Sequence, residues 1–261
     1  FFIYEDKILI MNKEESMLQK RLVELSRLAY NRGIVVFSDF LNLNELNILH
    51  TTPKDMFLSQ YKTYGGYDLS ERQMAVFLPD ALYYEYEYPI QTIEVSPLNK
   101  KFSEDLTHRD YLGALMNLGI ERSTIGDILP GEGEAFLFCQ DTIAEFICDN
   151  LEQIRHTHVK CEVVDAAAEV PQEEPVRQVI QVASPRVDAV IAKVYNKSRS
   201  DCLELFRAGK VYVNGRLCEN NSKPLEAGDV VNARGYGKFR ISGEPHATRK
   251  GKLAIEAEVY P

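Results

Sequence analysis

One ten-residue stretch constrains the fold of this chain more than any other. Residues 166–175 read AAAEVPQEEP, a run of small, acidic and proline residues. A segment of this composition cannot bury enough apolar surface to offset the entropy lost on ordering, so it is typical of linkers. The chain is therefore expected to fold as separate domains on either side of a linker at residues 166–183.

Charge changes sign at the same place. The whole chain carries 30 Lys+Arg and 39 Asp+Glu, a formal net charge of -9. Residues 184–261 hold 14 Lys+Arg against 9 Asp+Glu, a net of +5, which leaves 16 against 30, or -14, for residues 1–183. Because nucleic-acid phosphates are bound by clustered cations, an RNA partner is expected at the C-terminal part only.

The middle of the acidic part shows the periodicity of alternating strands and helices. Its order, βαββαβ over residues 73–165, is that of the ferredoxin-like arrangement, which RNA-recognition motifs share with many unrelated domains. The expected elements are strand 91–95, helix 109–118, strand 125–129, strand 135–139, helix 142–154 and strand 159–164.

The third of these strands departs from an RNA-recognition motif. Residues 132–139 read EGEAFLFC, with Glu132 where the motif has a basic residue and Glu134 where it has its first aromatic. Residues 90–165 hold 6 Lys+Arg and 14 Asp+Glu, a net of -8. The domain is therefore expected to be a scaffold or a protein-contact surface rather than an RNA platform.

Residues 1–72 are expected to form a small helical unit that supports the rest by packing. Leucines recur at helical spacing within residues 13–32, and Ser38 or Asp39 could cap a second helix that Pro53 ends. Together with the other parts this predicts an α+β protein.

The first ten residues, FFIYEDKILI, do not have the pattern of a leader. They lack a basic start, and charged residues interrupt the apolar run before a signal-peptide core could form. No other stretch approaches the ~20 apolar residues that span a bilayer. The expected location is the cytoplasm, with the five cysteines as reduced thiols.

The basic C-terminal part begins with two short helices and a hairpin. Apolar residues recur at helical spacing in residues 186–195, and Ser198 with Asp201 forms a capping-box pattern for a second helix that Gly209 ends. Residues 210–216 then alternate as a strand and turn at Asn214-Gly215, the strongest short signal for a hairpin.

This ordered pattern resembles the S4-like RNA-binding domain over residues 186–241. The matching motifs are R-V-D, S-R-S, R-A-G-K-V-Y-V-N-G and G-D-V-V. The resemblance implies an αL-type motif whose helices and hairpin present donors to the phosphates of folded RNA. At this surface it places Arg186, Lys197, Ser198, Arg199, Arg207, Lys210, Asn214 and Arg216; the cations Lys193, Arg234, Lys238 and Arg240 complete the predicted RNA-binding set.

Individual members of this set have a simpler alternative. Asn214 and Gly215 could serve the turn alone, and Asp188 is expected to pair with Arg186 or to cap its helix.

Two further motifs extend the resemblance beyond the S4-like domain. GGYDLSERQ from Gly65, and LTHRDYLGALMNLGIERSTIGDIL at residues 106–129, are similar to YlmH-like proteins, S4-domain proteins of Gram-positive division-gene clusters. The family implies a cytoplasmic protein that binds ribosomal RNA, with or without tRNA, on the large ribosomal subunit during rescue of stalled nascent chains. Five motif residues have no assigned role: His108, Arg109, Asp110, Gly126 and Asp127.

No catalytic residue, cofactor or metal is expected. The His108-Arg109-Asp110 trio lacks the asparagine of a kinase catalytic loop and is expected to start a helix. His156, His158 and Cys161 lack a fourth ligand, and strand alternation would separate their side chains.

Two other functions remain open at this point. S4-like modules are often fused to RNA-modifying enzymes, but neither a separate synthase domain nor a glycine-rich nucleotide loop is found. A division-linked scaffold would instead use the acidic region to bind protein partners. In that region residues 80–89, DALYYEYEYP, are expected to form an exposed edge strand or a protein contact.

Overall fold

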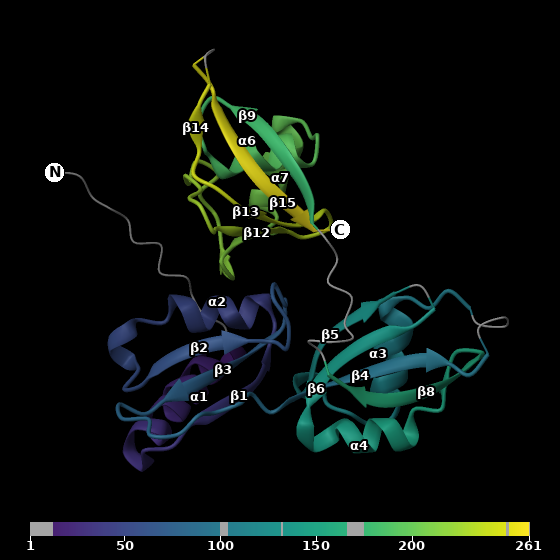
Figure 1. Ribbon diagram of the computed structural model, residues 1–261. Helices are drawn as coiled ribbons and strands as arrows, with labels where there is room; N and C mark the ends of the chain where they lie inside the picture. The colour runs from purple at the N-terminus through teal and green to yellow at the C-terminus, as the bar shows by residue number, and fades with distance from the viewer. Residues whose placement is uncertain (1–12, 100–103, 132, 166–174, 249–250, 261) are drawn as a thin grey trace. The chain divides into compact units, whose positions relative to one another are not determined.

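The computed structural model describes residues 13–99, 104–131, 133–165, 175–248 and 251–260 (Figure 1). The chain falls into two compact units, residues 1–170 and 171–261. Among the described residues, no helix is long and apolar enough to cross a membrane. Residues 1–12 and 166–174, which include the apolar first ten residues and the first half of the expected linker, lie outside the description.

The N-terminal part combines two helices with an antiparallel sheet, so the expectation of a small helical unit is wrong. Two helices, α1 (Lys13–Arg32) and α2 (Leu43–Thr51), accompany a three-stranded antiparallel sheet of order β1-β3-β2. Leucines of both helices share a core with Ala75 and Phe77 of the central strand. The strands are β1 (Val36–Leu41), β2 (Gln60–Tyr64) and β3 (Gln73–Leu78), and a short 3-10 helix, η1 (Lys54–Met56), follows α2.

The cap of α2 explains part of this correction. Asn42, rather than Ser38 or Asp39, caps the helix, and its side chain accepts hydrogen bonds from the N–H groups of residues 44 and 45. Ser38 instead lies in β1, where its hydroxyl accepts a hydrogen bond of 2.9 Å from the N–H of Ala75. A pairing partner that is distant in the sequence therefore determines the conformation of this segment.

Strand β3 belongs to a different sheet from the one expected. It lies in the range assigned to the central domain, yet it pairs with β1 and β2. The six central elements begin only at β4.

The central sheet has the order β5-β6-β4-β8-β7 with antiparallel neighbours, as expected for a ferredoxin-like βαββαβ arrangement. Helices α3 and α4 pack against it through one buried core. The elements are β4 (Ile90–Pro97), α3 (His108–Asn117), η3 (Arg122–Thr124), β5 (Ile125–Pro130), β6 (Ala135–Gln140), α4 (Asp141–Asn150), β7 (Gln153–Ile154) and β8 (Thr157–Val164). Helix α4 is shorter than expected because a β7–β8 hairpin follows it, with Arg155 at a positive φ of 52°.

The C-terminal unit is a seven-stranded sheet covered on one face by α6 and α7, with their apolar sides in a single core (Figure 1). Strand β9 pairs with β15, so the end of the segment expected to be a linker belongs to this sheet. The elements are β9 (Val176–Val182), α6 (Val187–Val194), α7 (Arg199–Arg207), β10 (Val211–Val213), β11 (Arg216–Leu217), β12 (Val230–Ala233), β13 (Gly237–Ile241), β14 (His246–Ala247) and β15 (Leu253–Tyr260).

Candidate nucleic-acid interface

The turn between α6 and α7 is built by local hydrogen bonds. Ser198 caps α7 and accepts a hydrogen bond of 3.1 Å from the N–H of Asp201, whose carboxylate accepts from the N–H of Ser198. This is the predicted capping box. It fixes the start of α7 next to the exposed residues Lys197 and Arg199, and the exposed Lys193 lies one helical turn before Lys197, in α6.

Two other turns bring cations next to this one. The N–H of Arg234, which follows β12, donates a hydrogen bond of 2.9 Å to the carbonyl of Lys210, which follows α7. Lys197 Nζ lies 4.8 Å from the ring centroid of Tyr236, in the turn after Arg234. Five exposed cations thus border one edge of the unit, which we call the basic edge: Lys193, Lys197, Arg199, Lys210 and Arg234.

Three tyrosines that pack beside these cations were missed by the sequence reasoning. The Arg234 guanidinium lies 5.0 Å from the ring centroid of Tyr212, and the Tyr236 ring lies 5.8 Å from that of Tyr195. Cations over tyrosine rings gain attraction and lose side-chain freedom before any ligand arrives. Tyr236, within the basic sequence RGYGKFRI at residues 234–241, is the signal that could have indicated this arrangement.

Two predicted RNA contacts are occupied by local structure. Arg186 donates a two-pronged set of hydrogen bonds to Asp188 at 3.0 and 2.7 Å, which is the pairing that the sequence predicts. The Asn214 amide donates to Asp229 at 2.7 Å and accepts from the N–H of Val230, and its φ is 51°. Asn214 therefore serves the turn at the end of β10.

The remaining predicted cations belong to elements outside the α6–α7 turn. Lys238 and Arg240 alternate along β13 with buried core residues, so they lie on the sheet face opposite the helices. Arg240 is paired in register with Glu258. Arg207 forms an exposed ion pair of 2.7 Å with Glu204, and Arg216 begins the short strand β11. The structure thus separates the predicted set over two faces.

The face of the central sheet that RNA-recognition motifs use for base stacking is covered in this protein. Phe136 and Phe138 on β6 are buried, at 3% and 0% exposure. The Tyr67 ring stacks on Phe138 with centroids 5.0 Å apart and planes 28° apart, in the manner of a stacked base. Beside them Glu94 of β4 is in register with Phe136 and with Glu162 of β8. RNA would meet a covered, acidic face here.

Asp127, one of the motif residues without a role, holds this cover in place. Its carboxylate accepts hydrogen bonds from the Tyr67 hydroxyl at 2.8 Å, the N–H of Glu71 at 2.7 Å and the N–H of Arg72 at 3.1 Å. The Arg72 side chain donates to the carbonyls of Phe40, Ile125 and Arg122. The GGYDLSERQ and GIERSTIGD motifs therefore join the two sheets of the N-terminal unit.

The charges of this junction are partly dehydrated. Burial, followed by the repulsion of Arg72, lowers the pKa of Arg122 to about 10. Loss of hydration, followed by the charge of Arg122, lowers the pKa of His108. Asp127 opposes both shifts, because its carboxylate favours the charged forms of its neighbours.

Gly126, a second motif residue, is required by close packing. A Cβ at this position would lie 2.8 Å from a ring carbon of Phe40 and 3.0 Å from Cβ of Phe138. Gly126→Ala is therefore expected to lower the free energy of unfolding by about 1–3 kcal/mol, as overpacked sites do. Denaturant unfolding of the full chain measures this. Gly113→Ala is the matched control, since a Cβ there meets no atom within 4 Å and alanine favours the helix; equal stability losses would refute the packing role of Gly126.

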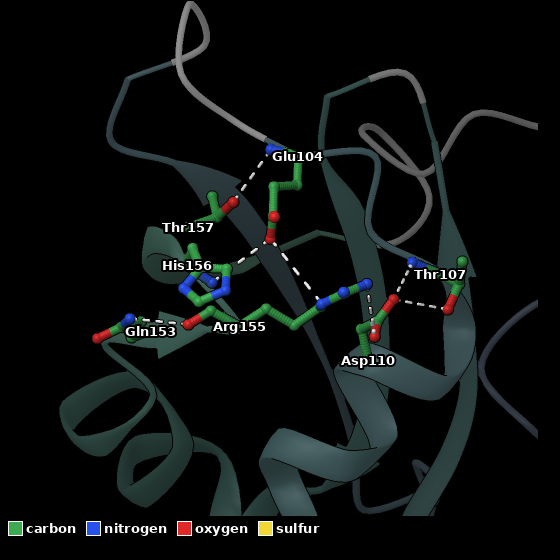
Figure 2. A network of polar contacts seen from close by, with 7 residues as sticks. All are labelled: Glu104, Thr107, Asp110, Gln153, Arg155, His156 and Thr157. Carbon is green, nitrogen blue, oxygen red and sulfur yellow. Dashed lines mark hydrogen bonds and ion pairs between the residues drawn. The ribbon is translucent and has the colours of Figure 1, made fainter.

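The motif trio starts α3, as expected. Asp110 accepts hydrogen bonds from both the N–H and the hydroxyl of Thr107, which lowers the pKa of its carboxyl, and Arg109 is exposed. Arg155 lies between Asp110 and Glu104, at 3.5 and 3.9 Å (Figure 2).

The open groove beside this network has balanced charges. It lies between α3 and residues 150–155, and Arg109 and Arg155 face it together with Asp110 and Glu152. This balance gives no preference for phosphate. Within the described residues, no three His, Cys, Asp or Glu side chains lie close enough to hold a metal ion.

The fold and the basic edge define an S4-domain RNA-binding protein, and the model of the S4 domain matches residues 185–231. A second model, described as "Putative RNA-binding domain in YlmH", matches residues 84–168. The "Ribosome-associated protein quality control protein P2" of Bacillus subtilis (strain 168) is 30% identical over 250 residues, which cover 94% of this chain and 95% of that protein. The chain belongs to the YlmH family.

A solved structure agrees on the fold. The "Cell division protein ylmH from Streptococcus pneumoniae" matches with a TM-score of 0.50 and 24% identity, over 65% of this chain and 100% of that chain. At this identity the match supports the fold alone.

Proposed function

We propose that this protein binds structured ribosomal RNA through the basic edge and acts on the large ribosomal subunit in translation quality control. The observation that carries the proposal is the convergence of Lys197, Lys210 and Arg234 from three separate turns of the S4 domain. Exposed ammonium and guanidinium groups fixed at one edge match the phosphates of a folded RNA, which is recognised by shape rather than by sequence.

The relation to Bacillus subtilis P2 supports the choice of the ribosome. That protein is described as ribosome-associated and as a quality control protein, and it aligns over nearly its whole length. Residues of the basic edge, rather than the covered sheet face of the central domain, would make the RNA contacts. A tRNA bound to the same subunit is the second RNA that the basic edge would contact under this proposal.

We further propose that the protein acts by binding, without catalysis, in the cytoplasm where ribosomes operate. The polar groups of the N-terminal junction are engaged in hydrogen bonds: Arg72 bonds Asp127 and the carbonyl of Arg122 across the junction, and the Arg122 guanidinium donates to the carbonyl of Ile125 in its own segment. In that role they support architecture rather than chemistry on RNA.

Sedimentation tests the ribosome proposal. The full chain, mixed with purified large and small subunits at low salt, is expected to migrate with the large subunit and to dissociate as salt rises, because phosphate contacts release counterions. Protein found only in the free fraction at low salt would overturn the proposal. Equal association with both subunits would restrict it to general RNA binding and remove the large subunit from it.

A further inference from the structure

The segment that joins the two sheets of the N-terminal unit is held by aromatic side chains. Residues 82–88, which we call the tyrosine strap, lie between β3 and β4 and belong to neither a helix nor a strand. The Tyr84 hydroxyl accepts a hydrogen bond of 2.9 Å from the N–H of Val35. The rings of Tyr86 and Tyr88 lie 6.3 and 5.4 Å from that of Phe37. Three alternate residues of the strap, Tyr84, Tyr86 and Tyr88, thus contact β1 or the residue just before it.

The intervening residues face solvent. Tyr83 is 93% exposed, and Glu85 and Glu87 are exposed as well. This alternation of contact and exposure is that of an extended strand. Residues 79–89 contain three acidic side chains and no Lys or Arg, so the outward side of the strap is anionic as well as aromatic.

Most of the strap backbone is unpaired; at its end the carbonyl of Tyr88 accepts a hydrogen bond of 2.7 Å from the N–H of Ile90. Within the described part of the chain, the N–H and C=O groups of residues 82–87 form no hydrogen bond with another protein group. Side chains alone hold the strap against the sheet. An extended segment with free backbone donors and acceptors is a template for pairing with another strand.

We propose that the tyrosine strap docks an extended, Lys- and Arg-containing segment of a partner protein by strand addition. The partner backbone would pair with residues 82–87, and its cations would lie opposite Glu85 and Glu87. A guanidinium of the same segment would stack on the exposed Tyr83 ring. An RNA strand does not fit, because its phosphates would be repelled by the carboxylates. This surface is separate from the basic edge and does not depend on the proposed function.

Peptide titration of the full chain tests the proposal. The probe is a synthetic peptide of about ten residues that alternates Lys or Arg with Val or Thr. Wild-type protein should bind it, and the strap variant Tyr83→Ser/Glu85→Lys/Glu87→Lys should bind at least about tenfold more weakly, since two attractive charge pairs become repulsive. Fluorescence anisotropy provides the readout, and circular dichroism confirms that the variant is folded.

Two controls separate strand addition from general attraction between charges. Glu145→Lys/Asp149→Lys makes the same two charge reversals at exposed sites on α4 and should leave binding nearly unchanged. A peptide of identical charge with methylated amides at alternate positions should bind poorly, because it cannot complete the ladder. Equal weakening by both protein variants, or equal binding of both peptides, would overturn the proposal.

A further measurement identifies the occupant. If a second copy of this chain covers the strap, sedimentation velocity will show dimers that the strap variant cannot form, which would overturn the choice of a basic partner. The strap variant should keep its affinity for ribosomal RNA. If the strap variant bound the peptide as tightly as the wild type but lost its affinity for ribosomal RNA, the strand-addition proposal would be overturned. The basic edge would then still be tested by its own variant.

Discussion

Arg199→Ala/Lys210→Ala is expected to weaken the affinity of the full chain for ribosomal RNA by about 10- to 100-fold near physiological salt. Both side chains are exposed members of the basic edge. Each one that neutralises a phosphate releases condensed counterions, so the slope of log affinity against log salt should also become shallower by about two units. Filter binding or anisotropy at several salt concentrations measures both quantities.

The salt slope makes this test specific. A folding defect would reduce the fraction of active protein at every salt concentration alike, whereas lost phosphate contacts change the slope. Lys20→Ala/Arg27→Ala removes the same charge from exposed positions on α1, far from the S4 domain in sequence, and should leave the slope unchanged. An unchanged slope and affinity in the Arg199/Lys210 variant would contradict the assignment of the RNA surface.

Asp127→Ala is expected to cost the N-terminal unit about 3–5 kcal/mol of unfolding free energy, the range for removing one partner from a buried charged network. Asp127 is 9% exposed, and its carboxylate accepts three hydrogen bonds. Its loss would leave the N–H groups of Glu71 and Arg72 unsatisfied. It would also remove a charge that offsets the repulsion between Arg72 and Arg122.

Hydrogen exchange of the full chain resolves where the loss occurs. Protection should fall in both sheets of the N-terminal unit, β1–β3 and β4–β8, and stay unchanged in β9–β15. Glu121→Ala removes a carboxylate from an exposed site six residues earlier and should be nearly neutral. A loss in Asp127→Ala no larger than in this control would show that the junction contributes little to stability.

The central domain differs from an RNA-recognition motif because the aromatic residues on its sheet face are covered by another segment of the chain. The sequence already placed two glutamates where an RNA-recognition motif has a basic and an aromatic residue. It did not reveal that the Tyr67 ring stacks on Phe138, because the two residues are far apart in the chain: Tyr67 lies in the loop between β2 and β3, and Phe138 lies on β6. The motif residue Asp127 gained a role only through partners about 55–60 residues away.

Local signals predicted the S4 domain well. The capping box at Ser198, the turn at Asn214-Gly215 and the pairing of Arg186 with Asp188 all involve residues close in sequence. The prediction of a helical unit at residues 1–72 was wrong because the hydrogen bonds between β1 and β3 join residues that are far apart in the sequence, and no local pattern relates them.

The helices and turns of the C-terminal unit, the reversal of charge at the linker and the resemblance to the S4 domain could all be read from the amino-acid sequence. These depend on side-chain periodicity, capping and composition, which act over a few residues. The folded structure was needed to show which predicted cations share the basic edge, which lie on the opposite sheet face, and that the central sheet is covered. Those outcomes depend on strand pairing and packing between distant segments, where many pairings satisfy the same local pattern and the buried contacts select one.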